Sequence, residues 1–139
     1  RAPQFTLQTV DGQTLNLDSL LGHPVVISYW ATWCIPCQQE LPILQKLYQE
    51  YSNSGLIVLT VNAIEQDNLE EVQSMLAEKG MTLPVLLDEG SAFASDYQAM
   101  FFPTTFYIDP SGGIRFIKLG DSSEQDLRTH VDSLMRGEL

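Results

Sequence analysis

The only two cysteines of the chain, Cys34 and Cys37, stand where a strand pattern gives way to a helix pattern. Residues 25–30 are nearly continuous in apolar and β-branched side chains, which is typical of a parallel strand covered on both faces. From Cys37 to Tyr51 apolar residues return at helical spacing. These residues are Leu41, Leu44, Tyr48 and Tyr51. Both thiols are therefore expected at the junction between a buried strand and a helix.

Strand and helix patterns also alternate along the rest of the chain. Asp11-Gly12 predicts a hairpin between two short strands, at 5–7 and 14–17. Asp67 and Glu70 have the spacing of an N-terminal capping box, and Ser122-x-x-Gln125 predicts the start of the last helix. The other expected elements are strands over 56–61, 85–87, 104–108 and 114–119, and short helices over 18–22 and 91–97.

The order of these elements indicates the fold class. Long helices that alternate with buried strands imply a parallel sheet with helices on both faces, and the closing hairpin adds an antiparallel edge. The length of 139 residues fits one domain, over 1–139. We therefore expect an α/β fold with a central mixed sheet flanked by helices, an N-terminal β-hairpin extension and a central insertion.

The charge of the chain excludes two classes of partner. There are 7 basic and 18 acidic residues, which gives a net charge of -11. Nucleic-acid binding needs a basic surface to neutralise phosphates, and an anionic lipid surface would repel this chain. We attribute the acidity mainly to solubility, and we expect a monomer because nothing in the sequence indicates an obligate dimer.

The spacing of the cysteines favours chemistry over architecture. A disulfide that closes so short a loop stabilises a fold little. A structural zinc site needs four ligands, and the only other soft candidates, His23 and His130, lie at opposite ends of the chain. Zinc binding and two inert buried thiols remain alternatives, but we expect no metal and no cofactor beyond a redox-active disulfide.

A Cys-x-x-Cys pair at a helix N-terminus has a specific chemistry. The unpaired N–H groups and the positive end of the helix dipole stabilise a thiolate at Cys34. Cys37 lies one turn further on and can attack a mixed disulfide formed at Cys34, which releases the substrate. Pro36 costs little in the first turn because its N–H would be unpaired there.

Two segments resemble the thioredoxin superfamily. Residues 30–37, Trp-Ala-Thr-Trp-Cys-Ile-Pro-Cys, resemble its active-site segment, and residues 102–106, Phe-Pro-Thr-Thr-Phe, resemble its cis-proline loop. Ala2-Pro3-x-Phe5 and Glu40-Leu41-Pro42 make the chain similar to the extracytoplasmic TlpA, ResA and CcmG branch, also called redoxin or AhpC/TSA-like domains. The similarity covers essentially the whole chain.

The resemblance implies roles for individual residues. Cys34 would be the exposed nucleophile and Cys37 the buried resolving thiol. Pro103 would follow a cis peptide bond, and the backbone of Phe102 would pair with an extended substrate segment. The residues expected to contact substrate are Trp33, Ile35, Pro36, Phe102 and Pro103.

One departure from the cytoplasmic thioredoxins concerns the proton carrier. The buried aspartate that they carry six residues before the first cysteine is replaced by Ser28. The resemblance to ResA-like proteins suggests Glu65, after the next central strand, as a partly buried carboxyl that exchanges a proton with Cys37. Glu40 is interpreted as a helix surface residue, and a solvated Glu65 remains the alternative.

The function expected from these residues is thiol–disulfide oxidoreduction by the Cys34–Cys37 pair. The resemblance suggests reduction of protein disulfides outside the cytoplasm, and cytochrome c maturation is one such role. A peroxiredoxin-like peroxidase is an alternative, although Thr32 and Trp33 break the pattern of that class. A Cu(I)-binding module is a second alternative, because thiolates suit Cu(I).

Partners and location follow from the same resemblance. We expect substrates with protein thiols or disulfides, and a membrane-bound or soluble thiol as electron donor. The chain begins with Arg1-Ala2-Pro3, without an initiator methionine. The resemblance implies an extracytoplasmic protein, periplasmic or membrane-anchored, and we expect its signal or anchor segment to precede Arg1.

Overall fold

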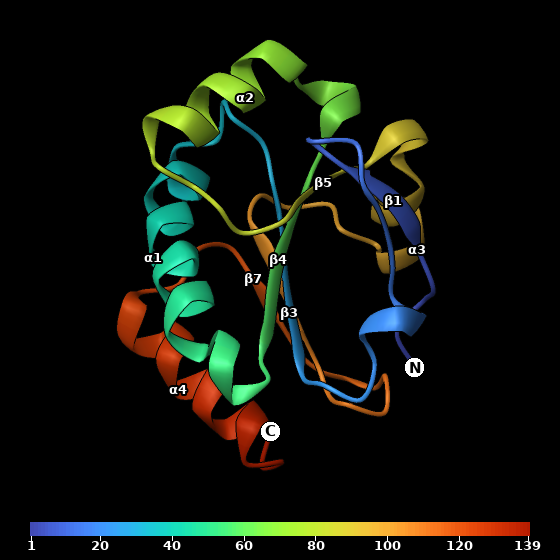
Figure 1. The fold of residues 1–139 in the computed structure, drawn as a ribbon, viewed down its shortest axis with the longest axis vertical. Coiled ribbons are helices and arrows are strands. Elements are labelled where there is room, and N and C mark those ends of the chain that lie inside the picture. The colour runs from blue at the N-terminus through green and yellow to red at the C-terminus, as the bar shows by residue number, and fades with distance from the viewer.

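A mixed sheet of seven strands forms the centre of the molecule (Figure 1). The computed structural model describes all residues, 1–139. The strands are β1 (Thr6–Thr9), β2 (Thr14–Asn16), β3 (Val25–Trp30), β4 (Ile57–Asn62), β5 (Val85–Leu87), β6 (Thr104–Ile108) and β7 (Ile114–Leu119). Their order in the sheet is β2-β1-β5-β4-β3-β6-β7. The central strand β3 runs parallel to β4 and antiparallel to β6, which confirms the mixed sheet.

Four α-helices connect the strands. They are α1 (Ile35–Tyr51), α2 (Leu69–Glu78), α3 (Ala92–Tyr97) and α4 (Glu124–Met135). Single 3-10 turns cover Asp18–Leu20, Ser52–Ser54, Ile64–Gln66 and Glu89–Ser91. None of the helices combines the length and apolar character needed to cross a bilayer.

The helices cover the two faces of the sheet unequally. Figure 1 shows α1 and α4 side by side on one face, with α2 above them, while α3 lies on the opposite side. Two apolar clusters fill the spaces between sheet and helices. Trp30, Leu44 and Val131 belong to the cluster under α1 and α4, and Tyr29 and Phe93 belong to the cluster under α3. Alternation along β3 supplies both clusters, because successive side chains point to opposite faces.

The expected N-terminal extension is confirmed. β1 and β2 form an antiparallel hairpin in which Leu7 pairs with Leu15, and β1 continues the sheet beside β5. Gly12, at the turn, has φ of 90°, a left-handed conformation that glycine adopts without steric cost.

Two helices begin one residue later than the capping patterns predict. The N-cap of α2 is Asn68 rather than Asp67, and its side chain accepts hydrogen bonds from the next helical N–H groups. The N-cap of α4 is Ser123 rather than Ser122. The prediction was wrong by one position because neighbouring residues of similar capping ability compete for the N-cap. Because neither residue caps a helix, Asp67 and Ser122 form hydrogen bonds with Thr32 and Glu40, next to the cysteines.

Candidate active site

Cys34 is the N-cap of α1, in the position expected from the sequence. Its backbone is extended, with φ −89° and ψ 110°, and its Sγ accepts a hydrogen bond from the Cys37 N–H at 3.2 Å. The two residues form a disulfide with their Cα atoms 5.2 Å apart. Once the disulfide is reduced, the unpaired N–H groups of the first turn stabilise a negative charge at Cys34.

The residues on either side of Cys34 are more exposed than the two cysteines. Cys34 is 6% exposed and Cys37 is 1% exposed, so both are buried and the expectation of an exposed nucleophile at Cys34 is wrong. Ile35 is 65% exposed and Trp33 is 54% exposed. A large partner therefore meets these apolar side chains before it reaches the disulfide.

The loop before Cys34 is held by Asp67. The carboxylate of Asp67 accepts hydrogen bonds from the Thr32 N–H at 2.7 Å, the Thr32 hydroxyl at 2.6 Å and the Asn62 side-chain amide at 3.0 Å. Burial by itself raises the pKa of Asp67, but these hydrogen bonds outweigh it, so the pKa lies below its usual value. Trp33 donates its indole N–H to the carbonyl of Gln66 at 2.8 Å. The end of β4 thus fixes the segment that carries the nucleophile.

The loop before β6 lies beside this segment. The Phe102–Pro103 peptide bond is cis, as the resemblance implied. The pairing of Tyr29 with Thr104 brings residues 101–103 alongside the end of β3. The ring of Phe102 packs edge-on against Trp33, with centroids 5.1 Å apart. Because proline has no N–H, Pro103 presents no backbone donor to an approaching substrate.

Glu40 is the buried ionisable group of the site. It lies one helical turn after Cys37 and is only 2% exposed. Its carboxylate accepts hydrogen bonds from the Ser122 N–H at 2.8 Å and, at longer range, from the hydroxyls of Thr105 at 3.4 Å and Ser28 at 3.5 Å. Burial raises the pKa of Glu40 to about 6, although the Ser122 hydrogen bond opposes this rise. Glu40 is therefore placed to exchange protons near neutral pH.

The burial of the two glutamates, Glu40 and Glu65, is the reverse of what the sequence suggested. Glu65 is exposed in a 3-10 turn, and its carboxylate accepts a hydrogen bond from the Gly90 N–H at 2.8 Å. The expectation of a partly buried Glu65 is wrong, because the chain turns outward after β4. The interpretation of Glu40 as a surface residue is also wrong, because the segment before α4 covers it.

Sequence reasoning missed the burial of Glu40 and the contacts of Asp67, although a signal for each was present. Glu40 lies three residues after Cys37 and four before Leu44, so it shares the face of α1 that these residues bury. Asp67 was assigned to a capping box, but the next residue, Asn68, is an equally good cap. Only the fold shows that Asp67 and Ser122 turn toward the site.

A hollow of about 480 Å³ opens beside Trp33. The ionisable residues among those that line it, Asp67 and Glu71, are both acidic. The remaining lining residues are Thr32, Trp33, Gln38, Gln66, Asn68 and Met75. No group of three or more His, Cys, Asp or Glu side chains is placed to hold a metal ion.

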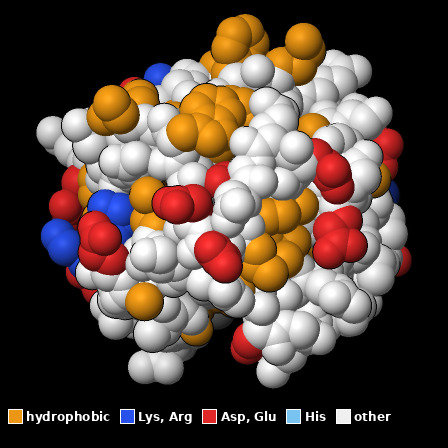
Figure 2. All heavy atoms as spheres, turned by 90° about the horizontal axis from the view of Figure 1, so that it is seen from above, with side chains coloured by type: hydrophobic (Ala, Val, Ile, Leu, Met, Phe, Trp, Pro, Cys, Tyr) orange, Lys and Arg blue, Asp and Glu red, His pale blue; other side chains and the backbone are white.

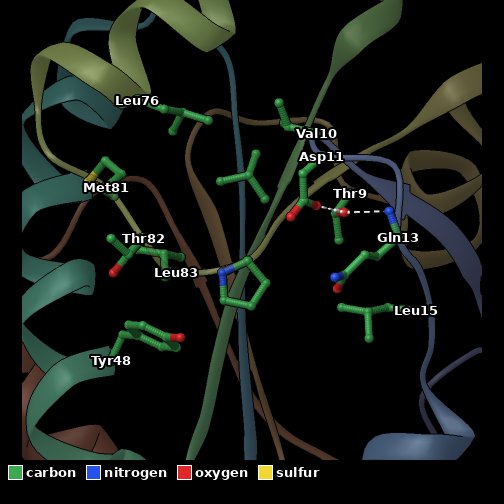
Figure 3. Close-up of a pocket in the computed structure, with 12 residues that line it drawn as sticks. Thr9, Val10, Asp11, Gln13, Leu15, Tyr48, Leu76, Met81, Thr82 and Leu83 are labelled. Atoms are coloured by element: carbon green, nitrogen blue, oxygen red, sulfur yellow. Dashed lines mark hydrogen bonds between the residues drawn. The ribbon is translucent and has the colours of Figure 1, made fainter.

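A second cavity, of about 450 Å³, lies between the β1–β2 turn and α1 (Figure 3). Figure 3 shows Tyr48 and Thr82 on one side of it and the turn from Thr9 to Gln13 on the other. The Thr9 hydroxyl donates a hydrogen bond to Asp11 and accepts one from the Gln13 N–H, which fixes the turn. None of the residues around the disulfide lines this cavity.

Comparisons with known proteins agree with this site. The AhpC/TSA family model matches residues 1–117. The chain is 34% identical to the thioredoxin-like protein YneN of Bacillus subtilis, over 95% of this chain and 77% of that protein. It is 33% identical to the thiol-disulfide oxidoreductase ResA of Geobacillus thermodenitrificans, over 96% of this chain and 75% of that protein. A thiol:disulfide interchange protein of the thioredoxin family from Chlorobium tepidum superposes with a TM-score of 0.87, at 25% identity, over 96% of this chain and 94% of that one.

Proposed function

The chain belongs to the AhpC/TSA family, and from this premise we propose that it is a thiol–disulfide oxidoreductase that reduces disulfide bonds of other proteins. The observation that carries the proposal is the Cys34–Cys37 disulfide at the N-terminus of α1, next to the cis peptide bond at Pro103. ResA relatives, named thiol-disulfide oxidoreductases, support the same activity.

The reaction proceeds in two exchanges. In the reduced protein the Cys34 thiolate attacks one sulphur of the substrate disulfide, which forms a mixed disulfide and releases one substrate thiolate. The Cys37 thiolate then attacks the Cys34 sulphur, which forms the Cys34–Cys37 disulfide and releases the second substrate thiolate. Two electrons pass from the protein to the substrate, and a thiol donor, membrane-bound or soluble, returns them in the same way.

In this scheme Glu40 is the general base that accepts the proton of Cys37. The thiol of Cys37 must lose its proton before it attacks, and the carboxylate of Glu40 lies on the same face of α1, one turn away. With a pKa of about 6, Glu40 is ionised in most molecules at neutral pH and accepts the proton. We therefore assign to Glu40 the role that the sequence suggested for Glu65.

The substrate binds as an extended segment along the loop before β6. The backbone of Phe102 pairs with it like an added strand, and Trp33, Ile35 and Pro36 border the disulfide on α1 and the loop that precedes it. The narrower substrate that we propose is an oxidised Cys-x-x-Cys-His segment of a c-type cytochrome, reduced outside the cytoplasm by a monomeric protein. The resemblance of residues 30–37 and 102–106 to the TlpA, ResA and CcmG branch suggests this assignment.

Turnover with a protein disulfide tests the proposal. The reduced protein is expected to reduce the disulfides of insulin catalytically with dithiothreitol as donor. Cys34→Ser abolishes the reaction, and Cys37→Ser accumulates a mixed disulfide at Cys34 that mass spectrometry detects. Robust peroxide turnover, or stoichiometric Cu(I) binding without disulfide exchange, would instead support one of the alternative functions. A faster reaction with a Cys-x-x-Cys-His peptide than with its His→Ala version tests the narrower substrate.

A further inference from the structure

Two large apolar side chains, Met100 and Phe101, project into solvent just before the cis peptide bond. Met100 is 79% exposed and Phe101 is 58% exposed. They lie in the loop between α3 and β6, where Thr104 donates its hydroxyl to the Phe101 carbonyl at 2.7 Å. Adjacent apolar side chains that are so exposed indicate an interaction surface more often than they indicate a role in stabilising the fold. We call these two residues the Met100–Phe101 patch.

The patch is continuous with the active site. Phe102, the next residue, packs against Trp33 with ring centroids 5.1 Å apart, and Trp33 directly precedes Cys34. A polypeptide whose disulfide reaches Cys34 therefore passes close to the patch. Figure 2, which looks onto the end of the molecule where α1 begins, shows apolar side chains gathered on this face, with acidic side chains between them.

Acidic side chains predominate on this face. Asp67 and Glu71 line the hollow beside Trp33, and Figure 2 shows basic side chains only toward the margin of the face. Five of the seven basic side chains of the chain are held in ion pairs that belong neither to the hollow nor to the patch. These pairs are Arg1–Asp18, Lys46–Glu124, Arg115–Asp109, Arg128–Glu50 and Arg136–Glu138. The face is therefore apolar within a negative field.

We propose that the Met100–Phe101 patch binds an apolar side chain next to the cysteines of a cationic, extended segment of another protein. The proposal rests on the proposed function, because the disulfide must contact that segment. Burial of the two exposed side chains supplies affinity, and Lys or Arg residues of the partner are drawn to the acidic face. A second copy of the chain is a poor occupant, because two molecules of net charge -11 repel each other.

Disulfide exchange with a set of synthetic peptides tests the proposal. Each peptide has the same oxidised Cys-x-x-Cys core, flanked by Phe and Lys, by Phe and Glu, or by Ser and Lys. The Phe and Lys peptide is expected to react fastest with the reduced wild-type protein, with an advantage over the Phe and Glu peptide that shrinks in high salt. Bis(2-hydroxyethyl) disulfide, which is too small to span the patch, reports the exchange chemistry separately.

The matched variants separate the patch from general effects of surface polarity. Met100→Ser with Phe101→Ser is expected to lower kcat/KM for the Phe and Lys peptide at least about tenfold relative to the rate with bis(2-hydroxyethyl) disulfide. The control, Ile117→Ser, removes another exposed apolar side chain, which is 44% exposed on β7 opposite Phe106, and leaves both rates unchanged. Thermal unfolding checks that the variants are folded, and Met100→Ser alone serves if the double variant is not.

Several results would overturn the proposal. Equal rates for the three peptides, or equal losses in the patch and control variants, would show that the patch does not select the substrate. A preference for the Phe and Glu peptide would reverse the proposed charge. A dimer in sedimentation that the patch variant abolishes would make a second copy the occupant. Failure of the wild-type protein to exchange with bis(2-hydroxyethyl) disulfide would instead contradict the proposed function itself.

Discussion

The carboxylate of Glu40 accepts a hydrogen bond of 2.8 Å from the backbone N–H of Ser122, a residue 82 positions further along the chain. This contact joins α1 to the segment before α4 and closes the site behind Cys37. It also keeps an ionisable group, 2% exposed, on α1 between Cys37 and Leu41, two members of the apolar cluster that contains both cysteines. A buried carboxylate in such a place is costly to charge, which suits a group that takes and returns a proton.

Replacement of Glu40 by Gln should slow the step in which Cys37 attacks the mixed disulfide. Gln keeps the size of the side chain but cannot take the proton, and general base assistance is typically worth about 100-fold or more. The wild-type rate should rise with pH through about 6, and this rise should be absent in Glu40→Gln. Stopped-flow exchange over this pH range measures both effects. Glu65→Gln is the matched control, and an equal slowing there would contradict the assignment to Glu40.

The same substitution should change the pH dependence of stability. Because burial raises the pKa of Glu40 from 4.5 to about 6 in the folded protein, its favourable contribution is complete below 4.5 and is lost as pH rises through about 6. Glu40→Gln should therefore raise the free energy of unfolding at pH 7 by up to about 2 kcal/mol, with little difference near pH 4. Denaturant unfolding at the two pH values measures this difference. A variant less stable than wild type at pH 7 would contradict the raised pKa.

Asp67→Asn should loosen the segment before the nucleophile. One amide NH₂ would then face donors at Thr32 and Asn62, which should cost about 1–3 kcal/mol of stability at neutral pH. Because the pKa of Asp67 is lowered in the folded protein, its stabilising contribution is present above its unfolded pKa and is lost as the solution becomes more acidic. Chemical unfolding at pH 7 and in acid measures the loss. Asp96→Asn, on the exposed side of α3, is the control and should change little.

Tyr107→Phe should leave the protein equally stable or make it more stable by up to about 1 kcal/mol. Tyr107 is fully buried on β6, and its hydroxyl has no hydrogen-bond partner. Removal of an unpaired buried hydroxyl relieves a desolvation cost without losing a bond. The matched comparison is Tyr97→Phe, which removes a 2.6 Å hydrogen bond to the Pro3 carbonyl and should cost about 1 kcal/mol. A destabilised Tyr107→Phe would mean that the hydroxyl has a partner in solution.

Local pattern was enough to predict the elements and the reactive pair. The apolar run at 25–30 predicted β3 with its observed bounds, and the cysteine spacing placed Cys34 at the start of α1. Both predictions depend only on residues close together in the sequence, where the spacing of apolar side chains distinguishes strands from helices. The cis peptide bond before Pro103 was predicted from resemblance alone.

The surroundings of the reactive pair could not be predicted in the same way. Glu40 is buried by Ser122, and the Trp33 loop is held by Asp67, which lies 35 positions after its partner Thr32. Such contacts depend on how distant segments pack, and no periodicity encodes them. The expectation that Glu65 is partly buried failed for the same reason, because position along the chain does not fix the direction of a side chain after a strand ends.

The reduction potential of the Cys34–Cys37 couple tests the central claim most directly. Equilibration of the protein against dithiothreitol and glutathione redox buffers, followed by thiol alkylation and mass spectrometry, measures it. The account predicts a reversible two-electron couple nearer to the thioredoxin value of about −270 mV than to the value of about −120 mV for a strong oxidant. A potential near about −120 mV would contradict the reducing function. A pair that fails to cycle between dithiol and disulfide would contradict the oxidoreductase assignment altogether.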